Sequence, residues 1–212
     1  MHVRQCIGIL SAVASVTAIP TAAIAQTGVE VGPLVALYAP VGTFNPNAGY
    51  STALPSKPSD LGGVAWGALG RLWLSPKLGV QLRGAAASSR FGGGMNCPGC
   101  SVTSPTRATI VTVTAEALHR PAPTILPLWF SAGLGIVRHG GPAYAPYGAP
   151  SPLAGVLGLG FDVHIGSHLT AALGVTELFY SLDFKGNGIT FEYGPQTDVL
   201  AHVALAWRSR LW

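Results

Sequence analysis

Apolar residues alternate with small or charged residues along several segments of this chain. In segment 198–208, the odd-numbered positions carry Val, Ala, Val, Leu and Trp, whereas Asp198, His202 and Arg208 lie at even-numbered positions. Segment 157–165 has the same pattern, with Leu, Leu, Phe, Val and Ile separated by Gly, Gly, Asp and His. A period of two is the side-chain period of a β-strand, so both segments are predicted to be strands with one apolar face.

The whole chain after residue 27 divides into segments of this kind, separated by clusters of Gly, Pro, Ser and Asn. Such a pattern is typical of an all-β protein, and the Gly and Pro content disfavours helix. Eight strands are predicted, at residues 28–40, 62–75, 77–90, 108–119, 127–139, 153–165, 168–183 and 196–211.

The connections between these strands alternate in length. Long connections are expected at 41–61, 91–107, 140–152 and 184–195, and short ones at 75–76, 120–126 and 166–167. An even number of antiparallel strands, with both chain ends on the side of the short turns, is typical of β-barrels that cross the bacterial outer membrane.

Composition supports a lipid-facing surface. The chain is 49% hydrophobic and only 9% charged, against about 25% charged residues in ordinary soluble domains. Beyond the N-terminal segment there is no run of the roughly 18 apolar residues that a membrane helix requires. An alternative is a soluble periplasmic lipocalin-like barrel, which binds lipid inside, but it needs more charges outside than this chain offers. The formal net charge of +4 is too small to indicate a nucleic-acid partner.

The first 25 residues are predicted to be a secretory signal peptide. A short positive start is followed by an apolar centre and by Ala23-Ile24-Ala25, a small-residue cleavage signal, so cleavage is expected after Ala25. Cys6 would be removed with it. Residues 26–212 would then form one outer-membrane barrel domain.

In these features the sequence resembles the small eight-stranded outer-membrane β-barrel proteins of the OmpA-like and OmpX-like group. The segments PLWFSAGLGIVRHG and SPLAGVLGLGFDVHIG and the terminal Trp212 carry the resemblance. It implies an antiparallel up-and-down barrel that is monomeric, contacts outer-membrane lipids, and meets the barrel-insertion machinery during assembly. It implies no cofactor. Trp212 is in phase with Arg208 and Arg210 rather than with Trp207, so a bulge or a degenerate insertion signal is expected at the end.

Six ionisable residues fall on the small-residue face of their strands and are predicted to point into the barrel. They are Arg71, Arg83, Glu116, Asp162, His164 and His202. The interior of an eight-stranded barrel is just wide enough to be filled by side chains, so these groups are expected to pair there in a structural ionic network. The alternative is a proton path or a narrow pore. Glu177 interrupts the apolar series of Leu173 and Val175, which suggests a bulge or a position above the membrane.

The CPGC segment places Cys97 and Cys100 in a predicted exported loop without a helix. A local disulfide is therefore favoured over a redox or metal site. No catalytic, cofactor-binding or metal-binding motif is predicted. As an alternative function, His164, Ser167 and Glu177 resemble the catalytic groups of outer-membrane lipid A deacylases, although the spacing of His and Ser differs.

Aromatic residues near the ends of the predicted strands are expected at the edges of the bilayer. They are Tyr38, Trp66, Trp73, Trp129, Phe130, Phe161, Phe179, Tyr180 and Trp207. The function that the sequence favours is non-enzymatic: a structural or surface-interaction role, including adhesion, exerted through long loops at the cell surface.

Overall fold

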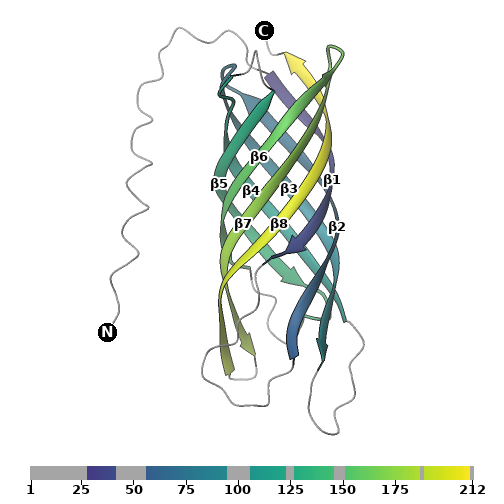
Figure 1. Ribbon diagram of the computed structural model, residues 1–212, viewed down its shortest axis with the longest axis vertical. Coiled ribbons are helices and arrows are strands. Elements are labelled where there is room, and N and C mark those ends of the chain that lie inside the picture. Colours follow the sequence, from purple (N-terminus) through teal and green to yellow (C-terminus); the bar gives the residue numbers. More distant parts are fainter. Residues whose placement is uncertain are drawn as a thin grey trace, which may run out of the picture.

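Eight antiparallel strands close into one barrel in the computed structural model of the protein (Figure 1). The structure describes residues 28–41, 56–94, 106–122, 127–145, 151–186 and 189–210. The strands are β1 (Gly28–Pro40), β2 (Ser56–Trp73), β3 (Leu78–Gly94), β4 (Thr106–His119), β5 (Leu128–Gly140), β6 (Leu153–Ile165), β7 (Leu169–Gly186) and β8 (Ile189–Arg210). The predicted eight-stranded all-β barrel is therefore confirmed.

Each strand pairs with its neighbours in the sequence, and β1 closes the barrel against β8, with Val35 opposite Val203. The short connections lie at the upper end in Figure 1, where β1 begins and β8 ends; we call it the turn end and the opposite end the loop end. At the turn end, the Ser75 hydroxyl oxygen accepts hydrogen bonds from the backbone amides of Lys77 and Leu78. Gly166 has a φ of 68°, a backbone conformation that residues with a side chain rarely adopt.

The predicted long connection at 184–195 is wrong, because β7 and β8 extend through most of it. β7 continues to Gly186 and β8 begins at Ile189, with a register shift between Ser181 and Asp183. Gly and polar residues in this segment suggest a turn by composition. Composition misleads here because the pairing of β7 with β8 continues through the segment, from Asp183 opposite Glu192 to Gly186 opposite Ile189.

The outer surface of the barrel is apolar. Leu159, Val203 and Trp207 are more than half exposed, and alternate residues such as Asp162 and His202 are buried. This arrangement contradicts the lipocalin-like alternative, which requires apolar groups inside and polar groups outside. Among the described residues, no helix is long and apolar enough to cross a membrane.

The aromatic residues divide between the two faces of the wall. Trp66, Phe130, Phe161, Phe179 and Trp207 point outward, as expected for rings at the bilayer edges. The same expectation is wrong for Tyr38, Trp73, Trp129 and Tyr180, which are buried inside. These four lie in the inward phase of their strands, where large rings fill the lumen and, for three of them, the polar group bonds to a buried carboxylate.

Candidate functional site: the charged interior of the barrel

Asp162 of β6 organises a group of buried charges near the turn end, which we call the turn-end cluster. Its carboxylate accepts hydrogen bonds from Arg71 Nη1 at 2.7 Å, from Trp129 Nε1 at 3.1 Å, and from Arg120. Arg71 also donates to Gln81 Oε1 at 2.6 Å and lies 3.7 Å from a carboxylate oxygen of Glu30. Charge-assisted contacts of this kind are what allow ionised groups to stay buried.

Two aromatic rings complete the turn-end cluster. The Arg71 guanidinium lies 4.7 Å from the centroid of the Trp129 ring, and that of Arg120 lies 3.5 Å from the centroid of Trp73. A guanidinium over an indole face gains a cation–π attraction that is stronger away from water. The rings therefore stabilise the two arginines as well as filling the lumen.

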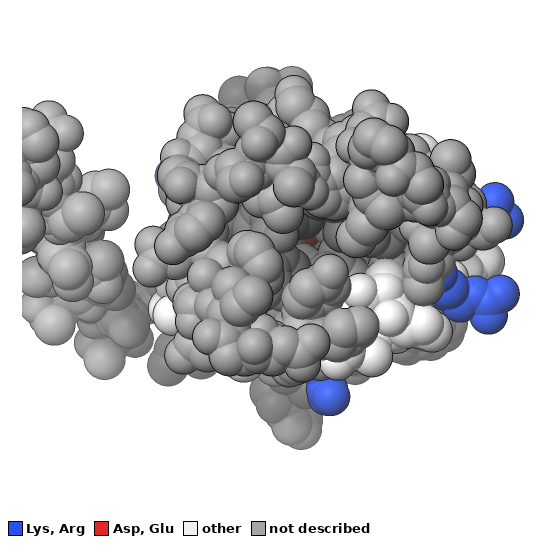
Figure 2. Space-filling view, turned by 90° about the horizontal axis from the view of Figure 1, so that it is seen from below, with Lys and Arg blue, Asp and Glu red and all other residues white. Residues whose placement is uncertain are grey.

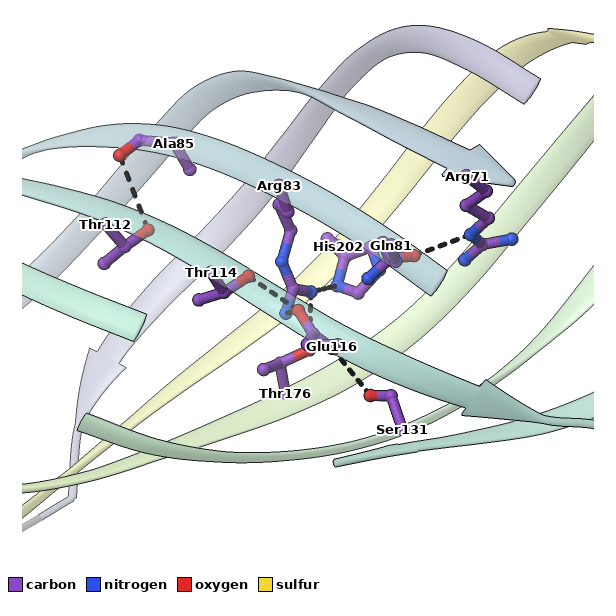
Figure 3. Close-up of polar contacts among 10 residues, drawn as sticks. All are labelled: Arg71, Gln81, Arg83, Ala85, Thr112, Thr114, Glu116, Ser131, Thr176 and His202. Carbon is purple, nitrogen blue, oxygen red and sulfur yellow. Dashed lines mark hydrogen bonds and ion pairs between the residues drawn. The ribbon is translucent and has the colours of Figure 1, made fainter. Parts of the chain in front are cut away.

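Glu116 of β4 organises a second group, the central cluster, which Figure 3 shows together with its neighbours. Its carboxylate pairs with Arg83 at 2.5 Å and accepts hydrogen bonds of 2.6 Å from the hydroxyls of Thr114 and Ser131. Arg83 Nη1 also contacts Thr176 Oγ1 at 2.5 Å and His202 Nδ1 at 3.3 Å. Because a guanidinium can only donate, His202 Nδ1 is the acceptor in this contact.

Both clusters span the lumen. Arg71 on β2 reaches Asp162 on β6, and Arg83 on β3 reaches Thr176 on β7. In a closed ring of eight strands, members four apart lie on opposite walls. Each of these side-chain contacts therefore crosses the barrel from wall to wall, and together they occupy it at two levels.

A third group, the loop-end cluster, surrounds Asp198 of β8. The hydroxyls of Tyr38 and Tyr180 donate to its carboxylate at 2.8 and 2.6 Å. His139 Nε2 lies 3.2 Å from the Tyr180 hydroxyl, and the Tyr144 ring packs edge-on against His139 with centroids 5.1 Å apart. Tyr144 comes from the turn directly after β5 and is buried, so this turn adds an aromatic ring to the barrel interior.

Five of the six residues predicted for the interior lie inside, namely Arg71, Arg83, Glu116, Asp162 and His202. The prediction for His164 is wrong, because its side chain is exposed near the turn end of β6. Its strand phase is correct, but Val163, His164 and Ile165 are all exposed, so the wall there no longer faces a filled lumen. Glu177 lies on the outer face opposite Leu157, with no register shift beside it.

Sequence reasoning missed Glu30, Arg120 and the members of the loop-end cluster. Alternation could have found Glu30, which stands between outward-facing Val29 and Val31. Arg120 lies one residue beyond the end of β4, in a predicted turn. The period of two applies only within strands, so it does not predict to which side the Arg120 side chain points.

The residues of the deacylase-like alternative are not brought together. His164 and Ser167 are exposed at the turn end, whereas Glu177 pairs with Leu157, seven residues away from His164 along β6. Seven residues of strand span about 23 Å, too far for a catalytic triad. No group of three or more potential metal ligands occurs among the described residues. Cys97, Cys100, the signal peptide and Trp212 lie outside the described residues, so the disulfide and the cleavage site stay predictions.

Comparison with solved structures finds outer membrane proteins of similar fold. The crystal structure of the outer membrane protein OprG from Pseudomonas aeruginosa matches with a TM-score of 0.54 and 12% identity, over 88% of this chain and 97% of that chain. The solid-state NMR structure of the outer membrane protein AlkL in DMPC lipid bilayers matches with a TM-score of 0.55 and 12% identity, over 88% of this chain and 90% of that chain. No family model and no curated protein matches the sequence.

The closed barrel and its apolar outer face agree with these likenesses. The protein has the fold of the small eight-stranded outer-membrane β-barrels, as its sequence resemblance predicts.

Proposed function

We propose that the protein is a non-enzymatic, non-conducting barrel of the outer membrane that acts structurally or through contacts made at its loop end. The observation that supports this proposal is the pair of wall-to-wall contacts, Arg71 with Asp162 and Arg83 with Thr176. Side chains that cross the lumen at two levels favour a closed interior over a continuous water path. The proposed monomer contacts outer-membrane lipids around its wall and the insertion machinery during assembly.

Planar-bilayer recording tests whether the barrel is closed. The wild-type protein should give no conductance steps, and the double variant Arg83→Ser/Glu116→Ser, which shortens both partners of the central ion pair, should leak more than the wild type. The matched control Arg138→Ser/Glu177→Ser also removes one cation and one anion, but from the outer face. It should remain as closed as the parent. Steady conductance of the wild type would overturn the proposal and make the protein a narrow channel.

A deletion strain separates a structural role from a surface-interaction role. A variant whose residues 95–105 are replaced by a short Gly-Ser linker keeps every described strand of the barrel. If the role is structural, the deletion should sensitise cells to detergent and this variant should restore resistance. If the loops carry the function, the deletion should reduce attachment of cells to surfaces and the variant should fail to restore it.

A further inference from the structure

The outer face of three adjacent strands changes from apolar to basic toward the loop end. On β3, β4 and β5 the outward positions carry Leu82, Val113 and Ile136 in the apolar part of the wall. Nearer the loop end, the outward positions carry Arg90, Arg107 and Arg138, all of which are exposed. Their chain neighbours Ser89, Ala108 and Val137 are buried, so the three arginines point away from the lumen. We call them the arginine patch.

The register brings like charges together within this patch. Arg90 and Arg107 are directly opposite in the β3–β4 ladder. Arg138 faces Val111, four residues from Arg107 along β4 and thus about 13 Å from it in the strand direction. Ser88 and Thr109 form the next outward pair on the turn-end side of the two arginines, and Thr109 faces Gly140 on its other side. Two hydroxyl-bearing residues and a glycine therefore lie between three long cationic side chains.

The part of the chain that the structure describes provides no acidic partner for the arginine patch. None of the three arginines forms an ion pair with a side chain that the structure describes. Among the described outward positions the acidic residue is Glu177, which lies on β7, three strands from β4. Like charges directly opposite in a sheet are destabilising. An anion from outside the chain would remove this repulsion.

We propose that the arginine patch binds the phosphate groups of a phosphorylated lipid in the outer leaflet of the membrane. Guanidinium groups bind phosphate oxygens in bidentate fashion. The patch lies where the apolar part of the wall ends, so a lipid whose headgroup contacts the arginines has its acyl chains beside Leu82, Val113 and Ile136. Seen from the loop end, the basic side chains that are coloured in Figure 2 project outward from the wall, as binding of a lipid beside the barrel requires.

Lipid A bearing two phosphates is the probe for this site. Purified protein in phosphatidylcholine nanodiscs would be titrated with fluorescent lipid A, and the triple variant Arg90→Gln/Arg107→Gln/Arg138→Gln should bind about tenfold more weakly or worse. The control Lys77→Gln removes an exposed charge at the turn end and should bind like the wild type. Replacing the three arginines by lysine should retain part of the affinity, because charge remains while the bidentate geometry is lost.

Unfolding in urea provides a second measurement and shows that the variants fold. In phosphatidylcholine alone, the triple glutamine variant should be at least as stable as the wild type, since it has lost only repulsion. Added lipid A should raise the unfolding midpoint of the wild type but not that of the variant. Equal lipid A binding by wild type and variant would overturn the proposal. Displacement of lipid A by inorganic phosphate at equal concentration would also overturn it, by showing that the patch recognises a free anion.

Discussion

At the scale of single residues, Glu116 determines whether the central cluster can exist. Its carboxylate is the shared acceptor of Arg83, Thr114 and Ser131, which come from three different strands. The strand phase places Glu116 inside, but which groups meet it depends on closure of the barrel. Gln81 is the residue directly opposite Glu116 in the β3–β4 ladder, and Arg83 lies two residues further along β3.

Replacement of Glu116 by alanine should destabilise the barrel strongly. It leaves the Arg83 guanidinium buried without an anion, and breaking a buried pair from one side typically costs about 3 to 5 kcal/mol. The measurement is the free energy of unfolding in urea in phosphatidylcholine vesicles. Glu177→Ala is the matched control, because the same residue type is removed from the outer face. Similar losses in both variants would contradict a closed central cluster.

At the scale of elements, β5, β6 and β7 fit together because two glycines leave room for one indole. Gly160 of β6 and Gly174 of β7 are cross-strand partners, and the Trp129 ring from β5 lies against both. A Cβ at Gly174 would lie 2.8 Å from ring atoms of both Trp129 and His202. The Trp129 ring would then have to move from the position in which its Nε1 donates a hydrogen bond to Asp162.

Gly174→Ala should therefore destabilise the barrel by about 1 to 3 kcal/mol, the usual cost of overpacking. Gly70→Ala is the control, since a Cβ there would meet no atom within 4 Å, and it should leave stability unchanged or slightly improved. Urea unfolding measures both, and the intensity of tryptophan fluorescence reports displacement of the ring. If Gly70→Ala is as damaging as Gly174→Ala, crowding around Trp129 is not the cause.

The lipid-facing side of β6 gives a test of depth within the membrane. Leu159 is 55% exposed near the middle of the strand, and Ile165 lies on the same face at its turn end. An arginine costs about 2 to 4 kcal/mol at the bilayer midplane and about 0 to 1 near the interface. Leu159→Arg should thus lose far more stability than Ile165→Arg in vesicles. Equal losses of stability in the two variants would mean that Leu159 does not lie nearer the bilayer midplane than Ile165.

At the scale of the whole molecule, the protein should behave as an integral membrane protein. Its outer face buries apolar area only in lipid, so neither high salt nor alkaline carbonate should release it from membranes, whereas detergent should. Fractionation of cells that express the full chain checks this, with a peripheral membrane protein as the control for extraction. Release by carbonate would contradict a transmembrane barrel.

The sequence by itself determined the architecture, because lipid outside and a narrow lumen inside impose a period of two on every strand. That pattern was enough to predict β1 and β6 with the observed bounds and to place Arg71, Arg83, Glu116, Asp162 and His202 inside. Only the tertiary structure decided which of these groups meet, because contacts such as Arg71 with Asp162 join residues 91 positions apart across the closed barrel. It also decided that His164 is exposed and that Trp129 is buried. Alternation gives the side of the wall on which a residue lies, whereas the height of that residue and the group opposite it depend on tilt, register and closure.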